Sequence, residues 1–134
     1  MSAAATERRL LQIVIAIACL VPLSAGGLGV LRGAAWVKGI GTPPPDLDSH
    51  FRYLSGIFLG VGLAFASCVP RIERTGARFR LLAAFVVLGG LARALSALEV
   101  GLPSTGNRLG LVMELGVVPL LILWQARVAR RAGH

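Results

Sequence analysis

Charged residues are scarce in this sequence, and acidic residues are the scarcest of them. Only 15% of the 134 residues are charged and just six are Asp or Glu, whereas 55% are hydrophobic. Soluble domains carry roughly a quarter charged residues, and a soluble helical bundle places them on the outer face of its helices. Several stretches here are apolar all round, which excludes an ordinary soluble fold and indicates a chain that lies in lipid.

The residue patterns of metal, redox and hydrolytic sites are also missing. The two cysteines, Cys19 and Cys68, lie inside apolar stretches and form no CxxC or zinc motif, so they are expected to be small buried hydrophobic residues. His50 and His134 are far apart in the chain, and no metal site is expected. No Ser/His/Asp arrangement and no glycine-rich phosphate loop is present. The sequence therefore predicts no cofactor and ranks a membrane enzyme last among the functions considered.

Four long apolar stretches dominate the chain, at residues 10–31, 51–69, 81–98 and 109–126. Each is long enough to cross a bilayer. Glu7-Arg8-Arg9 resembles the start of a signal peptide, but the first stretch continues to Leu31, so a retained helix is expected. The predicted fold is all-α, a single four-helix transmembrane domain over residues 1–134. In the main competing topology the third helix lies outside the membrane.

The basic residues predict the orientation of these helices. Nine arginines lie near the two chain ends and within segment 70–80. Segments 32–52 and 99–108 together contain only four basic residues. Cytoplasmic loops carry the excess of Lys and Arg, so both termini are expected inside, in a bacterial cytoplasmic (inner) membrane. The net charge of +8 is thereby explained without nucleic acid. The expected partners are the lipid bilayer and, at the cytoplasmic arginines, anionic lipid headgroups.

Small residues recur at helical spacing in the first three stretches. Lipid gives helices no hydrophobic reason to associate, so close packing of small residues matters. Plain packing between neighbouring helices is the favoured interpretation, with a functional cavity, a homo-oligomer seam or a membrane-protein partner as alternatives. The glycines concerned are Gly29 and Gly33, Gly56 and Gly60, and Gly89 and Gly90.

Two charged residues fall inside apolar stretches, Arg93 and Glu114. Arg93 shares a helix face with small residues, and Glu114 has Gly110 four positions before it and Asn107 seven before it. Arg93 lies six residues before Glu99 and Glu114 six residues after Arg108, at the outer ends of the two helices, which places both about 9 Å below the outer surface. We therefore expect an intramembrane ion pair between Arg93 and Glu114.

A second polar group precedes the apolar part of the second stretch. Asp46, Asp48 or Ser49 can cap that helix, and Asp48 with Arg52 is a favourable i,i+4 pair. The alternative is an outward-facing intramembrane pocket that favours an anionic or polar headgroup, since ionisable residues in a membrane are a functional hypothesis by default. The residues of that pocket would be Asp48, His50, Arg52, Tyr53, Arg93 and Glu114.

Three segments carry a resemblance to a known family. They are Asp46-Leu47-Asp48-Ser49-His50-Phe51-Arg52-Tyr53-Leu54-Ser55-Gly56, Pro70-Arg71-Ile72-Glu73-Arg74 and Gly89-Gly90-Leu91-Ala92-Arg93. The chain resembles an uncharacterised bacterial membrane family catalogued as domain of unknown function 4345, and more distantly the DoxX-like four-helix membrane proteins. The resemblance implies a four-helix inner-membrane protein and brings no activity.

Two functions from different classes follow. The first is binding of a lipid, a quinone or another small amphiphile in the outward-facing pocket. The second is a structural or accessory subunit of a larger membrane complex, packing through the glycine-rich faces.

Overall fold

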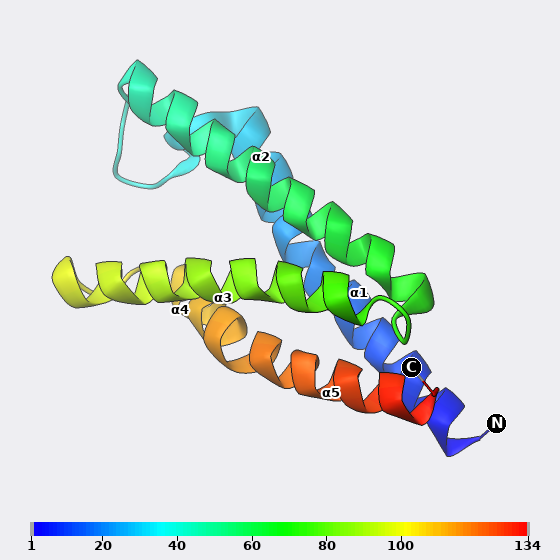
Figure 1. Cartoon of the computed structure of the whole chain (residues 1–134). Helices are drawn as coiled ribbons and strands as arrows, with labels where there is room; N and C mark the ends of the chain where they lie inside the picture. Colours follow the sequence, from blue (N-terminus) through cyan, green and yellow to red (C-terminus); the bar gives the residue numbers. More distant parts are fainter. Residues whose placement is uncertain (1, 134) are drawn as a thin grey trace. The chain divides into compact units, whose positions relative to one another are not determined.

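The computed structural model describes residues 2–133, and these residues form helices joined by short connections, without a strand (Figure 1). The α-helices are α1 (Ala3–Arg32), α2 (Pro45–Cys68), α3 (Gly76–Glu99), α4 (Thr105–Val112) and α5 (Val118–Arg131). Two 3-10 helices, η1 (Gly33–Trp36) and η2 (Val69–Arg71), follow α1 and α2, and a π-helix, η3 (Met113–Val117), joins α4 to α5.

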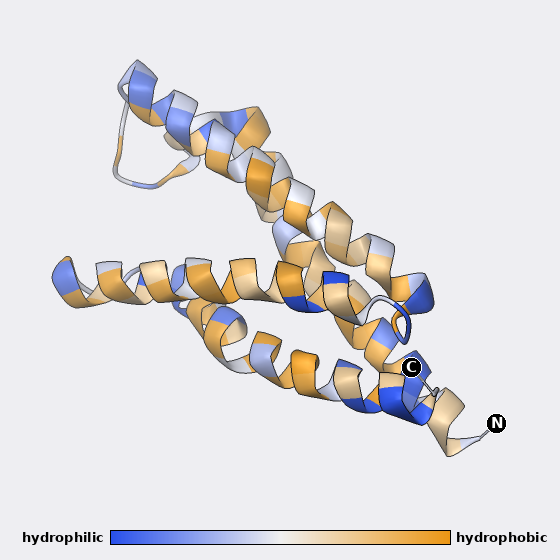
Figure 2. Ribbon diagram, in the orientation of Figure 1, coloured by the Kyte–Doolittle hydropathy of each residue, from blue (hydrophilic) through white to orange (hydrophobic). Residues whose placement is uncertain are grey.

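Four helical segments are long and apolar enough to cross a membrane: Ala3–Trp36, Pro45–Arg71, Gly76–Glu99 and Thr105–Arg131. Hydrophobic residues run along their middles and hydrophilic ones gather toward their ends (Figure 2). Many large apolar side chains are exposed, including Leu98 and Leu31, as expected where lipid covers the helices. The prediction of an all-α fold with four membrane-spanning helices is confirmed, and the chain is a multi-pass membrane protein.

The helices extend beyond the apolar stretches that predict them. α1 begins at Ala3 instead of residue 10, where the Ala5 N–H donates to Ser2 Oγ at 3.3 Å. The fourth segment starts at Thr105 and continues to Arg131, beyond the predicted 109–126. Helical hydrogen bonds depend on the backbone and not on lipid, so a helix continues into its polar flanks until a capping group or glycine ends it.

The described chain divides into two compact units. One is the hairpin Ile13–Val69, made of most of α1 together with α2. The other combines the start of α1, up to Gln12, with the chain from Pro70 onward. That residues 1–134 act as one domain stays a prediction.

Glycines let α1 and α2 approach each other closely in the hairpin unit. A Cβ on Gly26 would lie 2.7 Å from the backbone nitrogen of Leu59, and one on Gly62 would lie 3.0 Å from Pro22 Cβ. A Cβ on Gly29 would collide with the Ser55 side chain. Small residues at helix contacts are the usual basis of packing in membranes, and here they set the hairpin.

The second unit has its best-packed core around the segment between α2 and α3. Ile72 in this segment is fully buried, as are Leu11 of α1 and Gln125 of α5. Gln125 Nε2 donates to the carbonyl of Ile72 at 2.9 Å, and Gln12 Nε2 donates to that of Pro70 at 3.3 Å. Side chains from two helices thus satisfy backbone carbonyls of the connecting segment.

Candidate functional site

Arg93 and Glu114 lie together, in α3 and η3. Arg93 Nε is 3.1 Å from Glu114 Oε2 and Arg93 Nη2 is 3.2 Å from Oε1, so the two side chains face each other as paired forks. Arg93 Nη1 also donates to Asn107 Oδ1 at 2.8 Å, and Asn107 contacts Ser104 Oγ at 3.4 Å. Bidentate pairing of this kind is the strongest geometry available to an arginine and a carboxylate.

The π-helix that carries Glu114 has an identifiable cause. Pro119 follows it, and a proline ring clashes with the carbonyl four residues earlier, here that of Leu115 within η3. Widening the turn to a π-helix relieves that clash, and such segments are frequent at functional sites. Gly90 of α3 makes room for the widened turn, since a Cβ there would lie 2.8 Å from the Cβ of Glu114.

Asp48 and Arg52 form a second polar cluster, which caps the end of α1. Their side chains pair at 2.8 Å. Arg52 Nη1 donates to the carbonyls of Val30 at 2.5 Å and Leu31 at 3.2 Å. Asp48 Oδ1 accepts the backbone N–H of Ala34 at 2.8 Å. The pair thereby satisfies carbonyls that α1 leaves unpaired at its C-terminus and an N–H just beyond it.

This arrangement corrects the expectation that Asp46, Asp48 or Ser49 caps α2. The N-cap of α2 is Pro44, which makes no side-chain cap bond, and Pro45 opens the helix. Proline is well suited to the first helical position because its φ is preset and no N–H is needed there. Asp46 and Asp48 lie in the first turn, where they complement the helix dipole.

The other two predicted pocket residues are exposed, Tyr53 at 65% and His50 beside it in the same helix. Both belong to the hairpin unit, with Asp48 and Arg52, whereas Arg93 and Glu114 belong to the other unit. That all six line one pocket stays a prediction.

The six glycines predicted for packing fall into two groups. Gly29, Gly33 and Gly90 are close to neighbouring side chains. Gly60 and Gly89 have nothing within 4 Å of a built Cβ, and Gly56 meets only Val30, at 3.9 Å. Gly33 lies beyond the end of α1, with a φ of +65° that favours glycine, so its close contacts arise at a helix end and not along a helix stripe.

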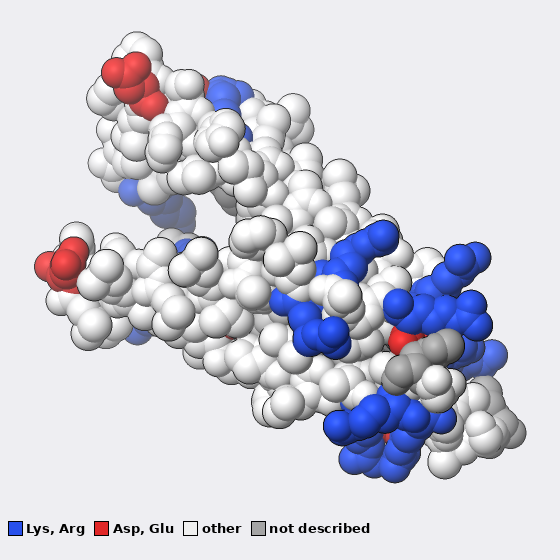
Figure 3. All heavy atoms as spheres, in the orientation of Figure 1, with Lys and Arg blue, Asp and Glu red and all other residues white. Residues whose placement is uncertain are grey.

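An acidic residue near the N-terminus, Glu7, is an interaction centre that the sequence pattern does not reveal. Arg127 Nε lies 2.9 Å from Glu7 Oε1, and Arg131 Nη1 bonds to Glu7 Oε2. Arg8, the next residue, pairs with Glu73 at 3.4 Å. Figure 3 shows a dense gathering of Lys and Arg side chains around the start of α1, the α2–α3 connection and the end of α5. The sequence signal was Glu7 itself, an acidic residue amid a basic cluster.

Gln125 was also not singled out from the sequence. It is a polar residue within an apolar stretch, and its side chain is fully buried. Its Oε1, like Glu73 Oε2, is buried without a hydrogen-bond partner among the described residues. Within residues 2–133 no group of three or more His, Cys, Asp or Glu side chains could hold a metal ion. His134, considered with His50 for a metal site, lies outside the described residues.

Comparison with known proteins assigns the chain to a family but gives no activity. No curated protein and no solved structure matches the chain. The relation to DoxX-like proteins stays a prediction. A family model described as a domain of unknown function (DUF4345) matches residues 10–125, which include Arg93, Asn107 and Glu114, and the chain belongs to that family.

Proposed function

We propose that this membrane protein binds a small amphiphile, such as a lipid or a quinone, at the Arg93 cluster of α3, α4 and η3. The observation that carries the proposal is that two N–H donors of Arg93 make no hydrogen bond to a described residue. A guanidinium has five N–H donors, and the three bonds to Glu114 and Asn107 leave two N–H groups. The Arg93 side chain is 35% exposed, so part of it is reachable from outside the protein.

The chemistry of such a ligand follows from the cluster. Glu114 neutralises most of the Arg93 charge, so a neutral or weakly charged acceptor fits better than a strong anion. A quinone carbonyl or a lipid ester supplies acceptor oxygens, and the many exposed apolar side chains of the membrane helices suit a hydrophobic tail. Unsatisfied donors at membrane depth cost several kcal/mol, which favours occupation by an acceptor.

The competing interpretation is a purely structural ion pair that fixes the register of α3 against η3. Breaking a buried pair by removing one partner destabilises a protein strongly. Loss of folding alone therefore does not distinguish the two interpretations, and the test must retain the pairing while removing the spare donors.

Arg93→Lys meets that requirement, because an ammonium can still bond to Glu114 but has no planar fork and fewer donors. Native mass spectrometry of the gently extracted protein should show a defined small molecule on wild type that this variant loses while staying folded. Arg108→Lys is the matched control, since Arg108 is an exposed residue of α4 outside the cluster, and it should keep the molecule. A wild-type protein that carries no small molecule would overturn the proposal.

A second candidate function is an accessory subunit of a membrane complex. The observation that favours it is the open face of α2, where Gly60 has no neighbour and Gly56 scarcely one. Gly60→Leu should leave the hairpin intact and weaken association with a partner chain. Gly62→Leu is the contrasting variant, because Gly62 packs on Pro22 and Leu23, and it should disrupt the hairpin itself.

We also propose a bacterial cytoplasmic membrane with both termini inside. The support is the distribution of basic residues, nine near the chain ends and segment 70–80 against four in the other two segments. Single cysteines in a Cys19→Ala/Cys68→Ala background, placed at Arg74 and at Lys38, would test this. A membrane-impermeant maleimide added to intact cells should label the cysteine at Lys38 and spare the one at Arg74.

A further inference from the structure

We infer that Arg127 and Arg131 of α5, braced by Glu7, form a binding site for the phosphate of an anionic phospholipid. The site lies in the unit that contains the start of α1 and the chain from Pro70 onward. It is separate from the Arg93 cluster and independent of the function proposed for that cluster. Glu7 and both arginines lie outside residues 10–125, the part of the chain that the family model covers.

The first argument is the geometry of the two guanidinium groups. Glu7, whose side chain is only 17% exposed, offers one carboxylate oxygen to Arg127 and the other to Arg131. Each arginine pairs with Glu7 through one nitrogen, which leaves its other guanidinium N–H groups for a ligand. Both arginine side chains are about half exposed. Two arginines held by one carboxylate leave one net positive charge, which matches the single negative charge of a phosphodiester.

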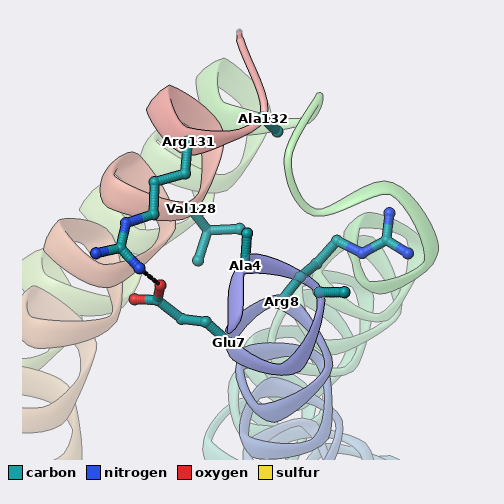
Figure 4. Close-up of a pocket in the computed structure, with 7 residues that line it drawn as sticks. Ala4, Glu7, Arg8, Val128, Arg131 and Ala132 are labelled. Carbon is teal, nitrogen blue, oxygen red and sulfur yellow. Dashed lines mark hydrogen bonds and ion pairs between the residues drawn. The ribbon is translucent and has the colours of Figure 1, made fainter. Parts of the chain in front are cut away.

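The second argument is the shape of the surface beside this triad. A hollow of about 270 Å³ is lined by Ala4, Glu7, Val128 and Arg131, among others (Figure 4). Figure 4 shows Arg131 turned toward Glu7, whereas Arg8, which also lines the hollow, has its guanidinium group directed away from Glu7. A second hollow, of about 430 Å³, also includes Glu7 and is lined by Leu123, Trp124 and Arg127. Arg131 therefore borders a hollow, whereas Arg127 lies beside a shallow, open surface next to Leu123 and Trp124.

The third argument is the amphipathic order along α5. Leu120, Leu123 and Arg127 follow one another at spacings of three and four residues and share a face with Trp124, which lies four residues after Leu120 and three before Arg127. Leu120 and Leu123 are 65% and 67% exposed. Arg127 lies about 6 Å farther along the helix than Leu123. An acyl chain on the leucines, a glycerol backbone near the indole and a phosphate at the guanidinium groups correspond to the layers of a phospholipid.

The charge of the surroundings favours an anion. Nine arginines lie in the terminal and 70–80 segments of this unit, with only Glu7 and Glu73 as acidic residues. Several of these arginines, such as Arg9 and Arg74, form no ion pair with a described residue. Polybasic segments beside a membrane attract anionic lipids, but general attraction does not require any particular arginine. The site proposed here does, and that difference is testable.

The experiment uses full-length protein in which Trp36→Phe leaves Trp124 as the sole tryptophan. The protein is titrated in neutral micelles with brominated phosphatidylglycerol and, separately, with brominated phosphatidylcholine, which quench tryptophan on contact. Wild type should prefer the anionic lipid. Arg127→Gln/Arg131→Gln should reduce that preference by about a hundred-fold, since each arginine loses a charge-assisted hydrogen bond to the phosphate that is worth about ten-fold. Arg9→Gln/Arg74→Gln removes the same charge away from the site and should change the preference by less than about two-fold.

Two further measurements distinguish loss of lipid binding from loss of folding and from binding of free phosphate. Glu7→Gln/Arg127→Gln/Arg131→Gln leaves no unpaired carboxylate behind, so it should fold even if the double variant does not, and it too should lose the preference. Sodium phosphate should not displace the lipid, because it lacks the apolar part that the leucines contact. Equal losses in the control pair, no preference in wild type, or full displacement by sodium phosphate would each overturn the inference.

Discussion

Replacing Gly33 with alanine should destabilise the α1–α2 hairpin more than the same change at Gly41. Both glycines have a left-handed backbone, with φ of +65° at Gly33 and +66° at Gly41. An L-residue in this conformation costs about 1–2 kcal/mol. Backbone strain should therefore contribute about equally at the two positions, which makes Gly41→Ala a matched control.

The contacts of the added methyl group separate the two variants. At Gly41 a Cβ meets nothing within 4 Å, whereas at Gly33 it collides with Asp48 Oδ1 and lies 2.7 Å from Arg52 Nη2. Asp48 Oδ1 accepts a hydrogen bond from the N–H of Ala34, and Arg52 donates to carbonyls at the end of α1. Relieving the collision moves these groups and weakens the cap. The loss at Gly33 should thus exceed the strain of about 1–2 kcal/mol.

The free energy of unfolding can be measured in mixed micelles by titrating sodium dodecyl sulfate and following helix content. The design adds Asp48→Ala, alone and combined with Gly33→Ala, to form a double-mutant cycle. Removing the Asp48 carboxylate removes the closest obstacle, so Gly33→Ala should cost less in that background. If Gly33→Ala and Gly41→Ala cost the same, the α1 cap does not depend on this close approach and the reasoning is refuted.

Other substitutions probe the second unit. Gly90→Ala should cost about 1–3 kcal/mol in the same unfolding assay, because its Cβ would press on Glu114, while Gly89→Ala, which meets nothing, should be neutral or slightly stabilising. Gln125→Leu should cost about 1 kcal/mol through its lost bond to the Ile72 carbonyl. Gln125→Glu should cost more at neutral pH, because it places an unpaired carboxylate at a fully buried position.

The membrane helices and the approach of Arg93 to Glu114 were accessible from the sequence for simple reasons. Helix length against bilayer thickness locates the spans. Two antiparallel helices joined by a short loop must then place residues at equal depth side by side. Equal spacing of Arg93 and Glu114 from the outer ends of their stretches was enough to bring them together, and they lie 3.1 Å apart.

The interactions at the helix ends could not be predicted from the sequence. Whether Arg52 bonds to Val30 depends on where α1 ends and how Gly33 turns the chain, and a pattern of apolar residues records neither. The π-helix depends on how the chain responds to Pro119, since a kink or a local break would relieve the same clash. Glu7 reaches Arg127 and Arg131 across almost the whole length of the sequence, so only tertiary structure brings them together.

The acidic residues sharpen the charge asymmetry of the chain. Nine arginines stand with Glu7 and Glu73 in the terminal and 70–80 segments, whereas the segments assigned to the other side carry four basic residues with Asp46, Asp48 and Glu99. Orientation responds to Lys and Arg and little to acids, but attraction of anionic lipid depends on the net field. Because Glu7 and Glu73 neutralise only part of the first set, the same arginines that predict the orientation leave a strongly positive surface. Glutamines at Arg9 and Arg74 and glutamines at Arg127 and Arg131 should therefore weaken the orientation signal alike. Loss of Arg127 and Arg131 also removes two arginines that Glu7 holds in place, so only that change should abolish the proposed phosphate site.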